Sequence, residues 1–386
     1  MEEQLSASKR FAPTFRRYSD AVTGFRHYWY PVAFSRELGK RPLARTICGE
    51  KIALFRDGPR AYALRDRCPH RGVPLSMGRK EFPGTISCMY HGWTYDLQSG
   101  RLAAVITDGP DSPICGKASV AVPTYPTEER AGLIWVYVGD EPAPPVEADI
   151  PEELLRPDTV LEGVSQVRSG NWRYAMENGC DEGHAKYQHR HALWYFFREN
   201  AAWAGDVRLF PSEDGLWLER TRGELHYADT YGALGRWPRR GPHFWQSRNR
   251  GPTTMSLRLP CIMRQHQRGW TEYQIYVPWD ETHYLGFLLA AKWTTGLAAL
   301  LFRARYRTYI RRLKHEAFYA EDQLAIDLMD TPPEQLYRPD VSITAWRRFC
   351  EERARRSPAD ALSDRLEPAD QRPARVGAGV EQPSLS

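Results

Sequence analysis

Two pairs of cysteine and histidine in the first quarter of the chain have the types and spacing of metal ligands. Cys68 and His70 form a C-x-H pair, and seventeen residues separate them from the C-x-x-H pair of Cys88 and His91. Each pair offers one thiolate and one imidazole, so two loops that close on each other would present two sulfurs and two nitrogens. The pattern predicts a metal centre with a mixed ligand set.

Two kinds of centre can use these ligands. Zn²⁺ accepts two cysteines and two histidines, but structural zinc sites usually pair Cys with Cys and His with His. A [2Fe-2S] cluster in which two cysteines hold one iron and two histidines hold the other explains one of each from each loop. Gly72 and Gly92 follow the pairs, where the backbone has to turn tightly. We favour the cluster and keep zinc as the alternative.

A second set of ligand-type side chains lies at 177–189. His184 and His189 are five positions apart, and Asp181 precedes them. Two histidines and a carboxylate are the parts of a facial triad that binds Fe(II) and leaves positions open for dioxygen and substrate. Positions five apart on a regular helix point about 140° from each other. We therefore expect a π-bulge, or a break after Gly183, that brings both histidines to one ion.

Both sets resemble motifs of the Rieske non-haem iron oxygenases. The first matches the CxH…CxxH pattern of their Rieske domain, and the second matches Asn-x-x-Asp-x-x-His-x4-His at Asn178, Asp181, His184 and His189. The resemblance implies that the two histidines bind a mononuclear iron. It implies that Asp181 links one of them to a Rieske histidine of a neighbouring subunit, with Asn178 supporting the site. The alternative for Asp181 is an ordinary helix-capping aspartate.

The third iron ligand has to come from far along the chain. The segment 316–323 resembles the late Glu-Asp segment of the family, and we assign the ligand to Asp322. Glu321 and Asp327 are the competitors. The alternative for each of these three residues is that it is an ordinary acid on a solvent-exposed helix surface, without a metal.

Length and patterning indicate two domains. The 386 residues suffice for two ordinary domains, and short apolar runs separated by turn residues predict an all-β first domain, with a hairpin turn at 96–102. We expect an arm at 1–26, a Rieske domain at 27–145, a catalytic domain at 146–356 and a disordered tail at 357–386. For the catalytic domain we expect strands at 160–168 and within 207–286, helix within 171–198, and helices at 316–329 and 342–355. The resemblance implies an α+β fold, in which the catalytic domain is a helix-grip antiparallel sheet with helices.

Charge and cysteine usage restrict the partners. The net charge of +5 is spread along the chain without a long single-sign run, so nucleic acid is a weak expectation and an acidic electron donor fits better. The seven cysteines form no disulfide pattern, and the N-terminus has no signal-peptide core, which favours the cytoplasm. The apolar stretch 284–302 contains Lys292, two threonines and two glycines, so we expect a buried strand followed by an amphipathic helix instead of a membrane span.

The resemblance implies the terminal oxygenase component of a Rieske oxygenase, an α3 homotrimer of the subgroup related to carbazole 1,9a-dioxygenase. Such a protein uses O₂ and electrons that originate from NAD(P)H, delivered by a separate ferredoxin or flavin reductase, because no nucleotide fingerprint is present in the sequence. The expected reaction is mono- or dioxygenation of an aromatic or polycyclic apolar substrate. Demethylation and oxidative cyclisation are alternatives with the same iron chemistry. A Rieske electron-transfer protein without oxygenase activity is the alternative from another class.

The aromatic run 194–197 directly follows the candidate histidines. Its members would either line an apolar pocket or belong to the core, and for any single one we favour the core.

Overall fold

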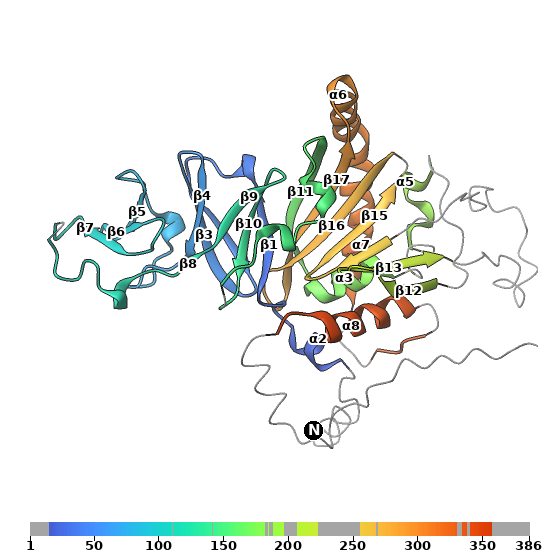
Figure 1. The fold of residues 1–386 in the computed structure, drawn as a ribbon, viewed down its shortest axis with the longest axis horizontal. Helices are drawn as coiled ribbons and strands as arrows, with labels where there is room; N and C mark the ends of the chain where they lie inside the picture. The colour runs from blue at the N-terminus through green and yellow to red at the C-terminus, as the bar shows by residue number, and fades with distance from the viewer. Residues whose placement is uncertain are drawn as a thin grey trace, which may run out of the picture.

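The computed structural model describes residues 15–109, 111–140, 142–181, 184, 188–196, 207–222, 255–267, 269–329, 334–337 and 340–356. Within these ranges, residues 28–138 form β-strands with only short 3₁₀ helices between them, and in the second part helices cover an antiparallel sheet (Figure 1). The predicted α+β class is therefore confirmed. The expected tail at 357–386 and residues 1–14 of the expected arm lie outside the described residues.

Three small antiparallel sheets make up the first part, in the orders β1-β10-β9, β2-β3-β4-β8 and β5-β6-β7. The predicted hairpin joins β6 to β7, and Gly100 closes it with a φ of +68°, a conformation that few residues other than glycine adopt. The elements are α2 (Arg16–Asp20), β1 (Tyr28–Phe34), η1 (Ser35–Glu37), β2 (Leu43–Ile47), β3 (Glu50–Asp57), β4 (Arg60–Arg65), η2 (Leu75–Met77), β5 (Thr85–Ser87), β6 (Trp93–Asp96), β7 (Leu102–Val105), η3 (Ala118–Val120), β8 (Thr124–Tyr125), β9 (Thr127–Arg130) and β10 (Leu133–Val138).

The second part is built on a seven-stranded antiparallel sheet in the order β11-β17-β16-β15-β14-β13-β12. Helices α6, η8 and α7 follow one another along the chain without a break, and η8 is π-helical. The elements are η4 (Val146–Ala148), η5 (Glu152–Leu155), β11 (Thr159–Ser169), α3 (Trp172–Cys180), η6 (Gln188–His191), α5 (Leu193–Phe196), β12 (Val207–Pro211), β13 (Trp217–Arg222), β14 (Met255–Arg258), β15 (Ile262–Gln267), β16 (Trp270–Pro278), β17 (His283–Trp293), α6 (Gly296–Arg305), η8 (Tyr306–Phe318), α7 (Tyr319–Leu328) and α8 (Val341–Arg353).

One hydrophobic core joins the two parts. Every residue of β1 and of β10 is buried, because these strands have the first part on one face and the catalytic sheet on the other. Across this boundary the rings of Phe34 and Phe287 lie 5.7 Å apart. The division at residue 145 stays a prediction, but the two parts pack as a single body around shared side chains.

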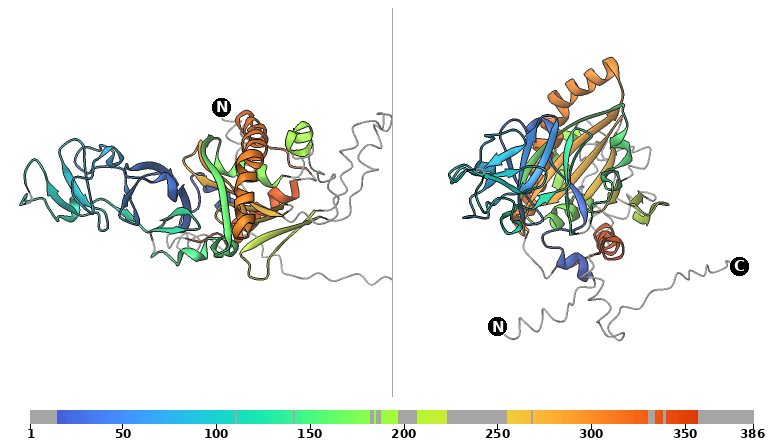
Figure 2. Two further views of the ribbon diagram at one scale, coloured as in Figure 1. Left: turned by 90° about the horizontal axis from the view of Figure 1, so that it is seen from above. Right: turned by 60° about the vertical axis from the view of Figure 1, so that its left-hand side comes forward.

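The apolar stretch 284–302 forms strand β17 and the beginning of helix α6, as expected from its sequence. Among the described residues, the structure contains no helix that is long and apolar enough to cross a membrane. Helix α6 stands beyond the end of the sheet (Figures 1 and 2).

An ion pair with a buried carboxylate connects Arg355, just after the last helix, to Asp149, which also binds the amide of Trp29 in the first part. The guanidinium of Arg355 donates to both carboxylate oxygens of Asp149, at 2.8 and 2.7 Å, and the amide of Trp29 donates to the same carboxylate at 2.9 Å. Asp149 is only 2% exposed. A carboxylate at this depth depends on its cationic partner, because water cannot replace the lost hydrogen bonds.

We therefore expect Arg355→Gln to lower the free energy of unfolding by about 3 kcal/mol, because it leaves the Asp149 carboxylate buried without a cation. Urea-induced unfolding followed by tryptophan fluorescence measures the change. Arg156→Gln is the matched control, since Arg156 pairs with Asp158 at 2.9 Å on the surface, where loss of a pair costs less than about 1 kcal/mol. Equal losses in the two variants would contradict the interpretation.

Candidate metal centres

The two loops with the C-x-H and C-x-x-H pairs repeat one hydrogen-bond pattern. In each loop the amide of the cysteine, Cys68 or Cys88, donates to the carbonyl five residues later. The amide of the glycine, Gly72 or Gly92, donates back to the cysteine carbonyl, and all four bonds measure 2.8 to 3.0 Å. The glycines have φ values of +75° and +65°, which a side chain would disfavour. The glycines seen in the sequence thus close both loops.

The four predicted ligands lie together, with the sulfurs inside and the imidazoles outside. Cys68 and Cys88 are 1% and 4% exposed, whereas His70 is exposed and His91 is half-buried. The imidazole rings lie 4.6 Å apart, and all four residues line one small pocket. The hydroxyl of Tyr95 lies 3.3 Å from the sulfur of Cys68. This set fits a binuclear cluster with a buried sulfur-bound iron and an outer nitrogen-bound iron better than a single zinc ion.

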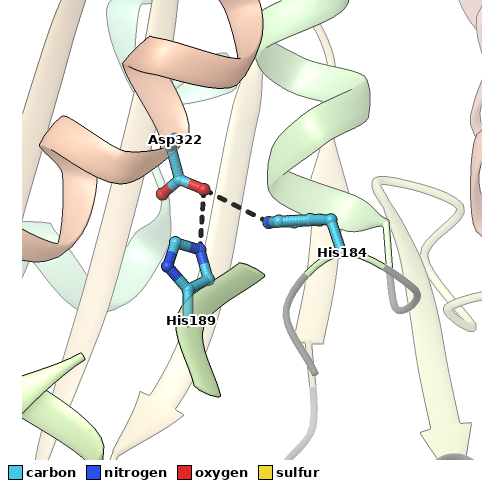
Figure 3. A group of neighbouring side chains, drawn as sticks. All are labelled: His184, His189 and Asp322. Carbon is cyan, nitrogen blue, oxygen red and sulfur yellow. Dashed lines mark hydrogen bonds and ion pairs between the residues drawn. The ribbon is translucent and has the colours of Figure 1, made fainter. Parts of the chain in front are cut away.

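The second set comes together from three separate segments (Figure 3). His184 follows the end of α3, His189 lies in η6, and Asp322 lies on α7. Their ligand atoms all lie within 4.8 Å of one another. The Nε2 atoms of His184 and His189 lie 3.2 and 2.9 Å from the same oxygen, Oδ1 of Asp322. Two imidazole nitrogens and a carboxylate directed at one point are a donor set that fits Fe(II).

The backbone solves the spacing problem of the two histidines by ending the helix. Helix α3 ends at Cys180, and Asp181 follows with extended angles of φ −69° and ψ 125°. His184 and His189 are therefore not on one regular helix, and His189 lies in a 3₁₀ segment. The expectation of an interrupted helix within 171–198 is confirmed for α3 and for the short α5, whereas η6 between them is 3₁₀. Gly183, where we expected the break, lies outside the described residues.

Of the three late acids, only Asp322 lies between the two histidines. Glu321 reaches His189 from the other side, with Oε2 at 2.8 Å from Nδ1. Asp327 instead accepts hydrogen bonds from Ser169 and Gln323 near the end of α7. We therefore keep Asp322 as the proposed ligand, and Glu321 holds the ring of His189 in place.

Asp181 and Asn178 contact the triad from α3 and its end. Asp181 Oδ2 lies 3.2 Å from Nδ1 of His184 and accepts the His184 amide at 3.1 Å. The Asn178 amide donates to Oδ1 of Asp322 at 3.0 Å. Each histidine therefore has its Nδ1 at a carboxylate, an arrangement that leaves Nε2 as the metal-binding atom.

The electrostatics of the site follow from its burial and its two acids. Burial lowers the pKa of His184, but hydrogen bonds to Asp181 and Asp322 outweigh it and raise this pKa to about 9. Burial raises the pKa of Asp322, yet His184 and His189 bring it below its ordinary value. A negative charge is thus held in the interior, ready to attract a cation.

The sequence did not reveal a further layer of contacts that fixes the triad. The ring of Phe318 stacks on His189 with centroids 3.8 Å apart, and the ammonium of Lys314 lies 3.7 Å from the Phe318 centroid. The hydroxyl of Tyr319 donates to Glu272 at 2.8 Å and accepts from Gln274, which anchors the start of α7 to β16. The alternation of polar residues at 272 and 274 within a buried strand was the only signal in the sequence.

Trp194 is buried in the core, where it lies against Trp270 and Tyr309. The side chains at 195 and 196, and residue 197, lie outside the described part.

The two candidate centres lie far apart within one chain. Figure 1 shows that β5, β6 and β7, beside the cluster loops, lie at the opposite end of the molecule from α3 and α7.

Comparisons with known proteins match both parts of the chain. Residues 28–126 match the model of the Rieske [2Fe-2S] domain, and residues 137–206 and 235–357 match that of the homotrimeric ring hydroxylases. The terminal oxygenase component of carbazole 1,9a-dioxygenase from Sphingomonas sp is 32% identical over 377 residues, covering 90% of this chain and 96% of that protein.

Solved structures of such oxygenases have the same fold. The terminal oxygenase of carbazole 1,9a-dioxygenase from Novosphingobium sp. KA1 superimposes with a TM-score of 0.75 at 28% identity, covering 90% of this chain and 98% of that one. The reduced complex between oxygenase and ferredoxin in carbazole 1,9a-dioxygenase gives a TM-score of 0.75 at 26% identity, covering 93% and 97%. The chain therefore belongs to the Rieske ring-hydroxylating oxygenases, in which it is a terminal oxygenase component.

Proposed function

We propose that this oxygenase hydroxylates an aromatic or polycyclic apolar substrate with O₂, by mono- or dioxygenation. The observation that supports this most is the convergence of His184, His189 and Asp322 on one buried point in a chain that also has a Rieske domain. The relatives named for carbazole, a polycyclic aromatic compound, support the substrate class.

Each centre has its own proposed ligands. Cys68, Cys88, His70 and His91 would hold the [2Fe-2S] cluster, and the triad would hold one Fe(II). Iron held by a facial triad activates dioxygen at its open positions. The protein's own part is to keep both Nε2 atoms and one carboxylate oxygen fixed, and to keep bulk water from the buried carboxylate, since Asp322 is 6% exposed.

Electrons would come from NAD(P)H through a separate ferredoxin or flavin reductase. The solved complex of a related oxygenase with ferredoxin supports such a donor. The exposed imidazole of His70 offers a place where a donor can approach. Seven free cysteines, two of them needed as thiolates, support a reducing cytoplasm as the compartment.

A homotrimer would connect the two centres. The match to a family described as homotrimeric supports this assembly. Head-to-tail contacts would bring the cluster loops of one subunit to Asp181 of the next. Asp181 already contacts Nδ1 of His184, and its side chain is 20% exposed, so it would bridge the two imidazoles.

The function test is oxygen uptake by the purified chain with a ferredoxin and reductase, against a panel of aromatic, polycyclic and N-methyl compounds. We expect uptake that depends on substrate, and His184→Ala should abolish it, because the variant loses an imidazole that no neighbour replaces. Iron analysis should show loss of the mononuclear iron, with the Rieske absorbance retained. An unchanged iron content in His184→Ala would instead favour a pure electron-transfer protein, and zinc in a colourless protein would favour the zinc alternative.

Glu321→Gln is the matched control for the ligand assignment. It changes an acid next to Asp322 that contacts His189 only at Nδ1, so it should retain the iron with affinity reduced by no more than about tenfold to a hundredfold. Asp322→Asn should lose the iron. If Glu321→Gln lost the iron and Asp322→Asn retained it, the third ligand would be Glu321.

The pKa of His184 predicts how pH affects metal binding. Because this pKa is about 9 in the metal-free protein, the imidazole is protonated at pH 7 and the metal must displace that proton. The affinity for Co²⁺ should rise by about tenfold per pH unit between pH 7 and 9 and then level off. Titrations followed by the visible bands of Co²⁺ measure this, and an affinity that does not change over the range would contradict it.

Asp181→Asn tests the bridge between subunits. The asparagine amide has nearly the same shape as the carboxylate, so both metal centres should remain. It is uncharged and has only one acceptor oxygen, however, so it cannot accept a hydrogen bond from each of two imidazoles on separate oxygens. We expect oxidation of the reduced cluster in a single turnover to slow by at least about a hundredfold. Rapid-mixing spectroscopy of the Rieske absorbance measures the rate, and an unaltered rate would leave Asp181 as a helix-capping residue.

A further inference from the structure

Helix α6 presents an apolar face to solvent. Leu297, Leu300 and Leu301 are 72%, 64% and 62% exposed, among the most exposed large apolar residues of the described part. Spacings of three and four place these leucines side by side on one face of the helix. Figures 1 and 2 show α6 extending beyond the end of the sheet, and the exposures of the three leucines place this face toward solvent.

The opposite face of the same helix is apolar too. Phe302 and Tyr306 are buried, and they pack α6 and the start of η8 onto the sheet. This packing accounts for one apolar face of the helix. A second apolar face is not needed for folding, and a helix that is apolar on both sides normally has a partner on each.

The charge of the segment indicates the chemistry of that partner. No Asp or Glu occurs from 282 to 315. The basic residues of the same stretch are Lys292, Arg303, Arg305, Arg307, Arg311, Arg312 and Lys314.

Three of these arginines are available to a partner. Arg303 pairs with Glu162 and Arg311 with Glu316. By contrast, Arg305, Arg307 and Arg312 are exposed, and no ion pair joins them to any residue that the structure describes. An exposed leucine face followed by unpaired arginines is the composition of a helix that binds at the surface of a membrane.

We propose that α6 and the start of η8 bind an anionic lipid bilayer at its surface. The three leucines would enter the boundary between headgroups and acyl chains, and the arginines would lie at the phosphates. A second copy of the chain fits this surface less well, because the segment 282–315 carries no Asp or Glu and the chain as a whole has a net charge of +5, so an anionic surface complements it better. The proposal does not depend on the substrate or on the identity of the electron donor.

Flotation of the full-length, iron-loaded protein tests the proposal, with vesicles of equal parts phosphatidylcholine and phosphatidylglycerol. The protein should float with these vesicles, and less with phosphatidylcholine alone or at high salt. Leu297→Ser/Leu300→Ser should lower the partition coefficient by about a hundredfold. The control Phe210→Ser/Leu216→Ser changes two apolar residues that are 43% and 47% exposed elsewhere, and it should float like the unaltered protein.

A charge variant gives a second, independent measurement. Arg305→Gln/Arg307→Gln retains the leucines and should weaken binding to the anionic vesicles by about fivefold per arginine. The Rieske absorbance confirms that each variant is folded. Failure of the unaltered protein to float, or flotation that the leucine variant does not reduce, would overturn the proposal. A changed oligomeric mass of the leucine variant in light scattering would also overturn it, by assigning this face to a second copy.

Discussion

One buried carboxylate oxygen determines how the catalytic part has to be built. Oδ1 of Asp322 receives the Nε2 atoms of His184 and His189 and the amide of Asn178, all at 2.9 to 3.2 Å. A carboxylate in the interior is costly unless several donors or a cation compensate for the water it has lost. Its donors come from α3, from His184 beyond the end of that helix and from η6, so the site exists only when three separate segments are held in register. Ending α3 at Cys180 is one requirement, because a continuous helix would direct the two histidines apart.

The second requirement is that α7 is rotated about its own axis so that Asp322 faces the histidines. Contacts with the sheet fix this rotation. Tyr319 lies three residues before Asp322, and its hydroxyl is tied to Glu272 and Gln274 on β16. Phe318, one residue earlier, stacks on His189. The π-helical turns of η8 end at this point, and a change from π to α geometry alters which residues face the sheet. The anchor at Tyr319 and the stack at Phe318 therefore select the rotation that places Asp322 opposite the histidines.

Features that depend on residues close together in the sequence could be predicted, whereas features that depend on contacts between distant segments could not. The cluster loops are local, so the spacing of Cys68 to His91 and the two glycines were enough to predict their closure. Strands were also predictable, because apolar runs and turn residues act over a few positions, whereas the α+β class came from the family resemblance. Helix α3 ends at Cys180, before the break that we expected after Gly183, and the long-range bond from Asn178 to Asp322 near this end gave no local signal. The choice of Asp322 over Glu321 needed a resemblance, because neighbouring acids on one helix differ only in direction. Phe318 and Tyr319 gave no local signal at all.

The two centres differ in burial, and that difference assigns their tasks. At the cluster loops the imidazoles face solvent, where an electron donor can approach, whereas the triad lies within the catalytic part around an acid that is 6% exposed. Within one chain these places are at opposite ends, and the core shared by β1, β10 and the catalytic sheet prevents the first part from folding back onto the second. A hinge between the parts would have to open that core, including the contact of Phe34 with Phe287. Since the chain does not bring its own centres together, we propose that the surface around Asp181 meets the cluster loops of another subunit. The rigidity of each subunit is thus the physical reason that we expect a head-to-tail assembly.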